Sequence, residues 1–259
     1  MNFVLFLPEG ENEVGVKKVR LPDNPNERIL VKAVEPEVEI LNRSVPKDGF
    51  FLLSLGVDEV EVENARFPGR LAVGRVFALS PYSNDLYVDA NDDLTLFALK
   101  RKGQILSRVA QELGATRVKF EGLRDVNTSV EYDVGVSASL MDEISVGAGG
   151  AKQAIQKMRN ALRMDLRFSA GPVNTDGALA VMHENLQDRD EDLLTLVEHR
   201  EAAGNELKKL EVALAVRNEM KDILEIGFKV PMDVLDFGID FKKQQESTDR
   251  YAIKYTIEF

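Results

Sequence analysis

Apolar and polar residues alternate almost without error along residues 128–140. The apolar positions are Val130, Tyr132, Val134, Val136, Ala138 and Leu140. Successive side chains of a strand point to opposite faces, so the pattern predicts a long strand with one apolar face and one face of small or acidic residues. A glycine-rich loop follows it at residues 147–150.

Residues 1–90 carry short apolar runs that are separated by turn-forming residues. The breaks contain Pro22, Pro25, Pro36, Pro46, Pro68 and Pro81. Such runs predict short strands and therefore a β-rich N-terminal part. At residues 37–40 and 59–63 acids alternate with β-branched residues, which predicts strands with one face in water.

Helical spacing appears after residue 90. Asp92 or Asp93 can cap a helix that runs to Leu113, and Gly114 can end it. A short helix is expected over residues 151–160. A charged helical stretch is expected over residues 185–224, with a break near Gly204, because glycine weakens the continuity of a helix.

The second part of this stretch, residues 206–224, has apolar residues on two sides of the predicted helix. One side carries Leu207, Leu210 and Leu214, and the other carries Val212, Val216, Met220 and Ile223. Such a helix either lies inside a core or contacts a partner.

Amphipathic strands dominate the chain from residue 116 onward. They are expected at residues 117–121, 128–140, 163–168, 224–230, 235–241 and 251–259, and residues 231–233 and the polar loop 242–249 connect the last three as hairpins would. The pattern predicts an α+β fold, with a mostly antiparallel, one-sided sheet that has helices packed on one face. The predicted division is a β-rich part at residues 1–90 and an α+β part at residues 91–259, which can also form one continuous domain.

Composition narrows the possible partners and compartments. The 259 residues are 44% hydrophobic and 30% charged, as in ordinary globular proteins, and the net charge of −11 argues against nucleic acid as a partner. Cysteine is absent, which favours a reducing compartment and a cytoplasmic location. No apolar run reaches the roughly 18–20 residues of a spanning helix, so a membrane is a partner only after a conformational change.

Several short patterns come close to known chemical motifs but miss required positions. The glycine loop at residues 144–152 lacks both the P-loop spacing and the dinucleotide-binding glycines around Lys152. Residues 89–93 place oxygen ligands at alternate positions, yet Leu94 stands where a calcium loop has glycine. The acids of residues 188–192 are expected at the start of a helix, where they favour its dipole.

The remaining candidate motifs also lack necessary parts. His183 and His199 are not at metal-binding spacing, and Ser137 lies in an alternating strand and not at a nucleophile elbow. Residues 103–114 resemble the first helix of a helix-turn-helix motif, but a strand is expected where the recognition helix should begin. The sequence therefore nominates no catalytic, cofactor-binding or metal-binding residue, and no cofactor.

Two functional classes follow from these observations. The first is a non-enzymatic protein that acts through protein–protein interaction or self-assembly, with a protein partner or a homo-oligomer formed through a sheet edge or the helix of residues 206–224. The second is an enzyme that uses carboxylates with Lys or Arg brought together by folding, because catalytic groups can lie far apart in a chain. The sequence favours the non-enzymatic class, since it shows no catalytic motif.

A third class is a conditional pore former. Residues 130–140 lead into the glycine loop and return through residues 162–168, with apolar positions for lipid and small or polar positions for a lumen. This composition resembles the insertion segments of the gasdermin and perforin-like families. The resemblance implies an effector that inserts β-hairpins into membranes.

Overall fold

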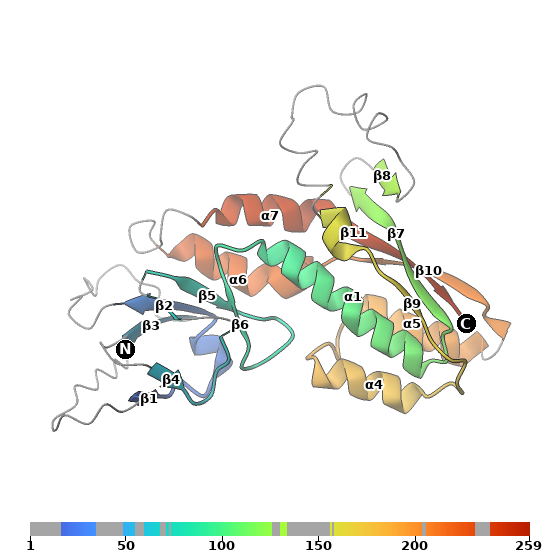
Figure 1. Cartoon of the computed structure of the whole chain (residues 1–259), viewed down its shortest axis with the longest axis horizontal. Helices are drawn as coiled ribbons and strands as arrows, with labels where there is room; N and C mark the ends of the chain where they lie inside the picture. Colours follow the sequence, from blue (N-terminus) through green and yellow to red (C-terminus); the bar gives the residue numbers. More distant parts are fainter. Residues whose placement is uncertain are drawn as a thin grey trace. The chain divides into compact units, whose positions relative to one another are not determined.

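The computed structural model describes residues 17–34, 49–54, 60–67, 71, 72, 74–125, 130–133, 156, 158–203, 206–230 and 239–259. Its strands and helices confirm the predicted α+β class (Figure 1). The chain divides into two compact units: unit 1 contains Met1–Leu94 and Lys221–Lys242, and unit 2 contains Thr95–Met220 and Lys243–Phe259. The proposed boundary at residue 90 stays a prediction, and the sequence pattern did not indicate that Lys221–Lys242 belongs with unit 1.

Unit 1 contains the β-rich N-terminal part that the sequence predicts. A four-stranded sheet has the order β3-β2-β5-β6, with a parallel pair between β2 and β3 and antiparallel pairs elsewhere. Separately, β1 and β4 form a parallel pair, and a short 3-10 helix covers Pro25–Glu27. The strands are β1 (Lys17–Val19), β2 (Leu30–Val34), β3 (Phe50–Ser54), β4 (Val60–Val62), β5 (Val76–Leu79) and β6 (Tyr87–Asp89).

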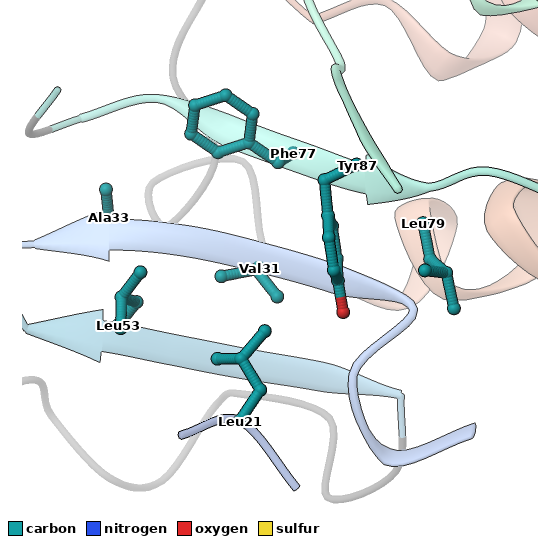
Figure 2. Close-up of a cluster of buried hydrophobic side chains, with 7 residues drawn as sticks. All are labelled: Leu21, Val31, Ala33, Leu53, Phe77, Leu79 and Tyr87. Atoms are coloured by element: carbon teal, nitrogen blue, oxygen red, sulfur yellow. The ribbon is translucent and has the colours of Figure 1, made fainter. Parts of the chain in front are cut away.

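An apolar cluster between these strands forms the core of unit 1. Figure 2 shows its members, which are Leu21, Val31, Ala33, Leu53, Phe77, Leu79 and Tyr87. The ring of Tyr87 stacks on Phe67 with 4.8 Å between centroids, and the Tyr87 hydroxyl donates a hydrogen bond to the carbonyl oxygen of Arg28 at 2.8 Å. Burial raises the pKa of Tyr87 to about 12, so the hydroxyl keeps its proton and remains a donor.

Unit 2 contains an antiparallel sheet with the order β10-β11-β7-β8, and β9 also pairs with β7. The strands are β7 (Arg117–Asp125), β8 (Val130–Asp133), β9 (Asp165–Arg167), β10 (Lys209–Leu214) and β11 (Tyr251–Glu258). β11 pairs with β7 along its whole length, whereas β8 and β9 pair with opposite ends of β7. Among the described strands, β10 therefore forms one edge of the sheet, and the short strands β8 and β9 form the other.

A bulge in β7 adjusts the alternation of its side chains. The register moves from Lys254 opposite Gly122 to Tyr255 opposite Phe120, which leaves Glu121 as the extra residue. Phe120 and Leu123 are three positions apart, yet both are buried. The bulge allows this because an extra residue reverses the facing of the residues that follow it.

Residues 158–162 are helical, and the α-helices whose bounds are described lie wholly or partly within unit 2. They are α1 (Leu94–Glu112), α4 (Thr175–Glu184), α5 (Glu191–Ala203), α6 (Arg217–Lys229) and α7 (Phe241–Arg250). The predicted end of α1 at Gly114 is confirmed: Gly114 has φ of +80° and donates to the carbonyl oxygen of Gln111, while Ala115 donates to that of Ala110. These two hydrogen bonds form a Schellman motif, in which glycine adopts the left-handed conformation at no steric cost.

The sheet of unit 2 is one-sided, as the alternation predicts. Its inner face carries buried apolar residues and lies against α1, since Gly103 of α1 closely approaches the ring of Tyr255. Its open face carries charged residues that pair across strands. Inner-face residues include Val118, Phe120, Leu123, Val212, Leu214, Ile253, Tyr255 and Ile257.

The prediction of a helix over residues 206–224 is wrong. Lys209–Leu214 forms β10, and α6 begins only at Arg217. Leu210, Val212 and Leu214 fit a period of two as well as two helical faces. Pairing with β11 places all three on one side of the strand, where Val212 and Leu214 are buried and Leu210 is half-buried. Tertiary pairing therefore decides a pattern that is locally ambiguous.

Two further assignments near the C-terminal end are wrong. Residues 224–229 lie in α6 and not in a strand, because Met220, Ile223 and Leu224 repeat at helical spacing and are each buried. The predicted polar loop at residues 242–249 lies in α7, whose buried residues Phe241 and Thr248 are two helical turns apart. The final predicted strand is confirmed as β11.

Parts of the sequence predictions lie outside the described residues. Of the long strand at residues 128–140, the structure describes β8 alone, and the glycine loop at residues 147–150 and most of the strand at 235–241 are not described. The strand expected at residues 163–168 appears as the shorter β9. In the described part of the chain, no helix combines the length and apolar character needed to cross a membrane.

Candidate functional site

A buried cluster of charges surrounds Lys102 in unit 2. The ammonium nitrogen Nζ lies 2.5 Å from Oδ2 of Asp190 and 2.7 Å from Oε1 of Glu219. It lies 3.5 Å from Oδ2 of Asp192 and donates a hydrogen bond to the carbonyl oxygen of Ala215 at 2.7 Å. We call these four side chains the Lys102 cluster.

Local structure places each member of the Lys102 cluster. Lys102 lies in α1, while Asp190 precedes α5 and its Oδ1 accepts a hydrogen bond from the backbone N–H of Leu193 at 2.9 Å. Asp192 and Glu219 lie in the first turns of α5 and α6. Carboxylates at these positions complement the positive end of the helix dipole, so the ammonium group joins two acidic helix starts to α1.

Burial and charge oppose each other in the cluster. The side chains of Lys102 and Asp190 are each 4% exposed and that of Glu219 is 10% exposed. Burial alone would lower the pKa of Lys102, but the attraction of Glu219 and Asp190 outweighs it and raises that pKa. Burial raises the pKa of Glu219 and of Asp192, because Lys102 compensates only part of the cost of removing these carboxylates from water.

The geometry indicates that the Lys102 cluster stabilises the packing of α1 against the starts of α5 and α6. The ammonium group is enclosed by carboxylate oxygens and one carbonyl oxygen, which all belong to the protein. A buried cation with such partners connects the elements that carry them, and removing it would leave charges without compensation. In the described residues, no three His, Cys, Asp or Glu side chains are placed to hold a metal ion.

The open face of the sheet in unit 2 carries ion pairs between neighbouring strands. Arg117 of β7 binds Asp165 of β9 through two nitrogen–oxygen contacts of 2.8 Å, and it lies 3.6 Å from Glu258 of β11. Hydrogen bonding to Arg117 lowers the pKa of Asp165. Lys254 of β11 lies 3.3 Å from Glu211 of β10, so paired charges extend from one edge of the sheet to the other.

The outer edge of β10 presents backbone groups without a strand partner among the described residues. The N–H of Phe259 donates to the carbonyl oxygen of Lys208 at 3.0 Å, just before β10 begins. In an antiparallel pair, residues bond to the same neighbour at every second position. Leu210, Val212 and Leu214 therefore bond to β11, whereas the N–H and C=O groups of the alternate residues Lys209, Glu211 and Ala213 point away from it.

The side chains at these outward-bonding positions are exposed. Lys209, Glu211 and Ala213 all lie on the open face, and no described strand covers the edge beside them (Figure 1). Lys209 and Glu211 lie 3.5 Å apart along the strand. An edge with free hydrogen-bonding groups is a template for one more strand.

The structure explains several of the motifs weighed from the sequence. Oδ1 of Asp89 accepts hydrogen bonds from the backbone N–H and the side chain of Asn91, and its other oxygen pairs with Arg75. These oxygens stabilise a turn. Nδ1 of His183 lies 3.1 Å from Asp188 in an exposed pair. Ser137 and Lys152 lie outside the described residues.

Neither the Lys102 cluster nor the open edge of β10 was identified from the sequence. Lys102 stands in the basic run of residues 100–102 and was not singled out from the sequence, although it falls on the apolar side of α1. Ala98, Leu99, Ile105 and Leu106 are three or four positions away and are buried, which is the signal that could have revealed it. The edge at β10 was missed because its residues were assigned to a helix.

Comparison of the chain with protein-family models, with curated proteins and with solved structures gives no match.

Proposed function

We propose that this protein acts without catalysis, through protein–protein interaction, by accepting an extended segment of a partner as an additional strand along β10. The observation that carries the proposal is the row of outward-pointing backbone groups at Lys209, Glu211 and Ala213. Strand addition takes its affinity from main-chain hydrogen bonds and its selectivity from alternate side chains.

The opposite edge of the same sheet, formed by β8 and β9, is less suited to strand addition than β10. β8 and β9 divide the exposed side of β7 between them and are short, with bounds of Val130–Asp133 and Asp165–Arg167. Short edge strands are one way in which proteins discourage pairing. β10 offers the longer continuous edge.

The alternatives receive less support from the described residues. The carboxylate-based enzyme would have the Lys102 cluster as its candidate site, yet the ammonium group there is already enclosed by protein oxygens. The pore-forming alternative rests on residues 128–168, most of which lie outside the described residues. We place the protein in the cytoplasm, since a chain without cysteine suits a reducing compartment.

A labelled peptide tests whether the edge accepts a strand. One probe has the sequence of residues 207–214, and a second probe has the same composition with Lys209 and Glu211 exchanged. We expect the protein to bind at least the first probe, as measured by fluorescence anisotropy. A protein that binds neither peptide would overturn the proposal.

Two substitutions at one position locate the binding to the edge. Glu211→Pro removes an outward N–H without removing a hydrogen bond to β11, so we expect it to abolish peptide binding. Glu211→Thr also lacks the carboxylate but keeps the N–H, and it should retain measurable binding. Equal binding by the proline variant and the native protein would place the peptide elsewhere, and thermal unfolding of both variants checks that β10 still pairs with β11.

A further inference from the structure

We infer that the partner of β10 is a second copy of this chain, with the two β10 strands antiparallel about a twofold axis and Lys209 of one copy opposite Glu211 of the other. This inference rests on the proposed strand addition at the same edge. It identifies the partner and the register of the pairing.

The charges of β10 select one register from those that the backbone allows. The twofold axis can pass through Leu210, Glu211 or Val212. In each case the residues whose backbone groups point outward, Lys209, Glu211 and Ala213, lie opposite outward-pointing residues of the other copy or beyond the end of its strand. A centre at Glu211 places that carboxylate opposite its own copy, which is unfavourable. A centre at Leu210 places Lys209 opposite Glu211 twice, so that opposite charges meet on both sides of the axis.

The burial of Leu210 supports the same register. Leu210 lies on the inner face of the strand but remains half-buried, whereas Val212 and Leu214 on that face are buried. With the axis at Leu210, its side chain meets Leu210 of the second copy in a pair without hydrogen bonds, where side chains approach closely. Pairing would thus cover the apolar residue that the single chain leaves partly open.

The pairing would join the sheets of two copies into one. Lys209 and Glu211 of opposite copies would exchange both of their N–H···O bonds, since they are the hydrogen-bonded pairs of this register. The open faces of the two sheets would lie on the same side of the joined sheet. With the axis at Leu210, only residues 209–211 of the two β10 strands lie opposite each other, and residues 212–214 extend beyond the start of the other strand. So short an overlap is a small interface, and we expect a dimer that dissociates on dilution.

A charge exchange tests the register in the full chain. Lys209→Glu and Glu211→Lys each create like charges opposite each other, and each should weaken the dimer about tenfold or more, as measured by sedimentation velocity over a range of concentrations. The double variant restores opposite charges and should recover most of the affinity. Lys119→Glu makes the same change in net charge as Lys209→Glu, but on β7 and away from the edge, and should leave the dimer unchanged.

The outcomes separate this inference from the proposed function. A native chain that stays monomeric at every concentration, but binds both peptides equally, would overturn the second-copy inference and leave strand addition standing. A dimer that persists in Glu211→Pro, or one that the double variant fails to rescue, would also overturn it. A monomer that binds neither peptide would overturn both.

Discussion

Gly103 and Tyr255 approach each other so closely that no larger residue fits at position 103 without a shift. A Cβ atom added to Gly103 would lie 2.3 Å from the hydroxyl oxygen of Tyr255. That hydroxyl is buried and has no hydrogen-bond partner among the residues that the structure describes. The contact lies between the middle of α1 and the inner face of β11, so it sets how closely the helix packs on the sheet.

Gly103→Ala should destabilise unit 2 by about 1–3 kcal/mol, although alanine is normally the better residue within a helix. The reason is the collision with the Tyr255 hydroxyl. Chemical denaturation of the native chain and the variant measures the free energy of unfolding.

Tyr255→Phe provides the matching control, because it removes the oxygen nearest to the added Cβ. The nearest remaining ring atom would be 3.1 Å away, so Gly103→Ala should cost less in the Tyr255→Phe background than in the native one. Equal costs in both backgrounds would show that the hydroxyl does not limit the packing.

Lys102→Met should destabilise unit 2 by about 3–5 kcal/mol, because it leaves Asp190 and Glu219 buried without a cation. Lys100→Met changes an exposed lysine of the same helix and should change the free energy of unfolding little. Denaturant unfolding followed by circular dichroism compares the two variants. Similar effects would argue against an energetic role for the Lys102 cluster.

The stability of unit 2 should rise as the pH falls from neutrality toward the raised pKa of Glu219. Burial raises the pKa of Glu219 and Asp192 above their unfolded values, so folding is favoured when these groups carry protons, and that contribution is lost as pH rises through the folded pKa. Unfolding free energies across a pH series measure the slope. Glu219→Gln cannot titrate and should reduce it.

At lower pH the opposite trend should appear. The pKa values of Asp165 and Glu211 are lowered, chiefly by hydrogen bonds with Arg117 and Lys254. Their stabilising contribution is present above the unfolded pKa and is lost as pH falls through the folded one. Stability should therefore pass through a maximum on the acid side of neutrality, and a continuous fall from neutral pH downward would contradict the assignment of Glu219.

Arg200→Lys should destabilise unit 2 by about 1–3 kcal/mol. The buried guanidinium donates to the carbonyl oxygens of Leu113 at 3.0 Å and Leu207 at 2.9 Å, and it lies 4.2 Å from the centroid of the Phe259 ring. Lysine keeps the charge but lacks the planar group that makes these contacts together. His199→Ala, at the exposed neighbouring position, is the control, and thermal unfolding measures both.

Alternation and capping predicted the parts of the fold that depend on local rules. Gly114 ends α1, because glycine readily adopts the positive φ needed at a helix end. Tyr251–Glu258 forms a strand, because its apolar residues alternate with a period of two. Residues 209–214 could not be assigned in this way. Their apolar positions suit both a strand and a two-sided helix, and pairing with β11 chose the strand.

The Lys102 cluster also combines features that local sequence patterns predict with features that only tertiary packing decides. Asp190 and Asp192 could be placed at a helix start from local preference alone, whereas Glu219 was assigned to the end of the wrongly predicted helix of residues 206–224. Their convergence on Lys102 could not be predicted in this way, because the four residues come from α1, α5 and α6 and from distant parts of the chain.

The sequence by itself determined the α+β class, the one-sided character of the sheet and the positions where several helices begin or end. These properties depend on residues that are neighbours in the chain. Only the tertiary structure decided that residues 209–214 form an edge strand, that Lys102 is buried among acids, and that Gly103 meets Tyr255. Each of these depends on which distant segments pack together, and packing selects among local patterns that are compatible with more than one structure.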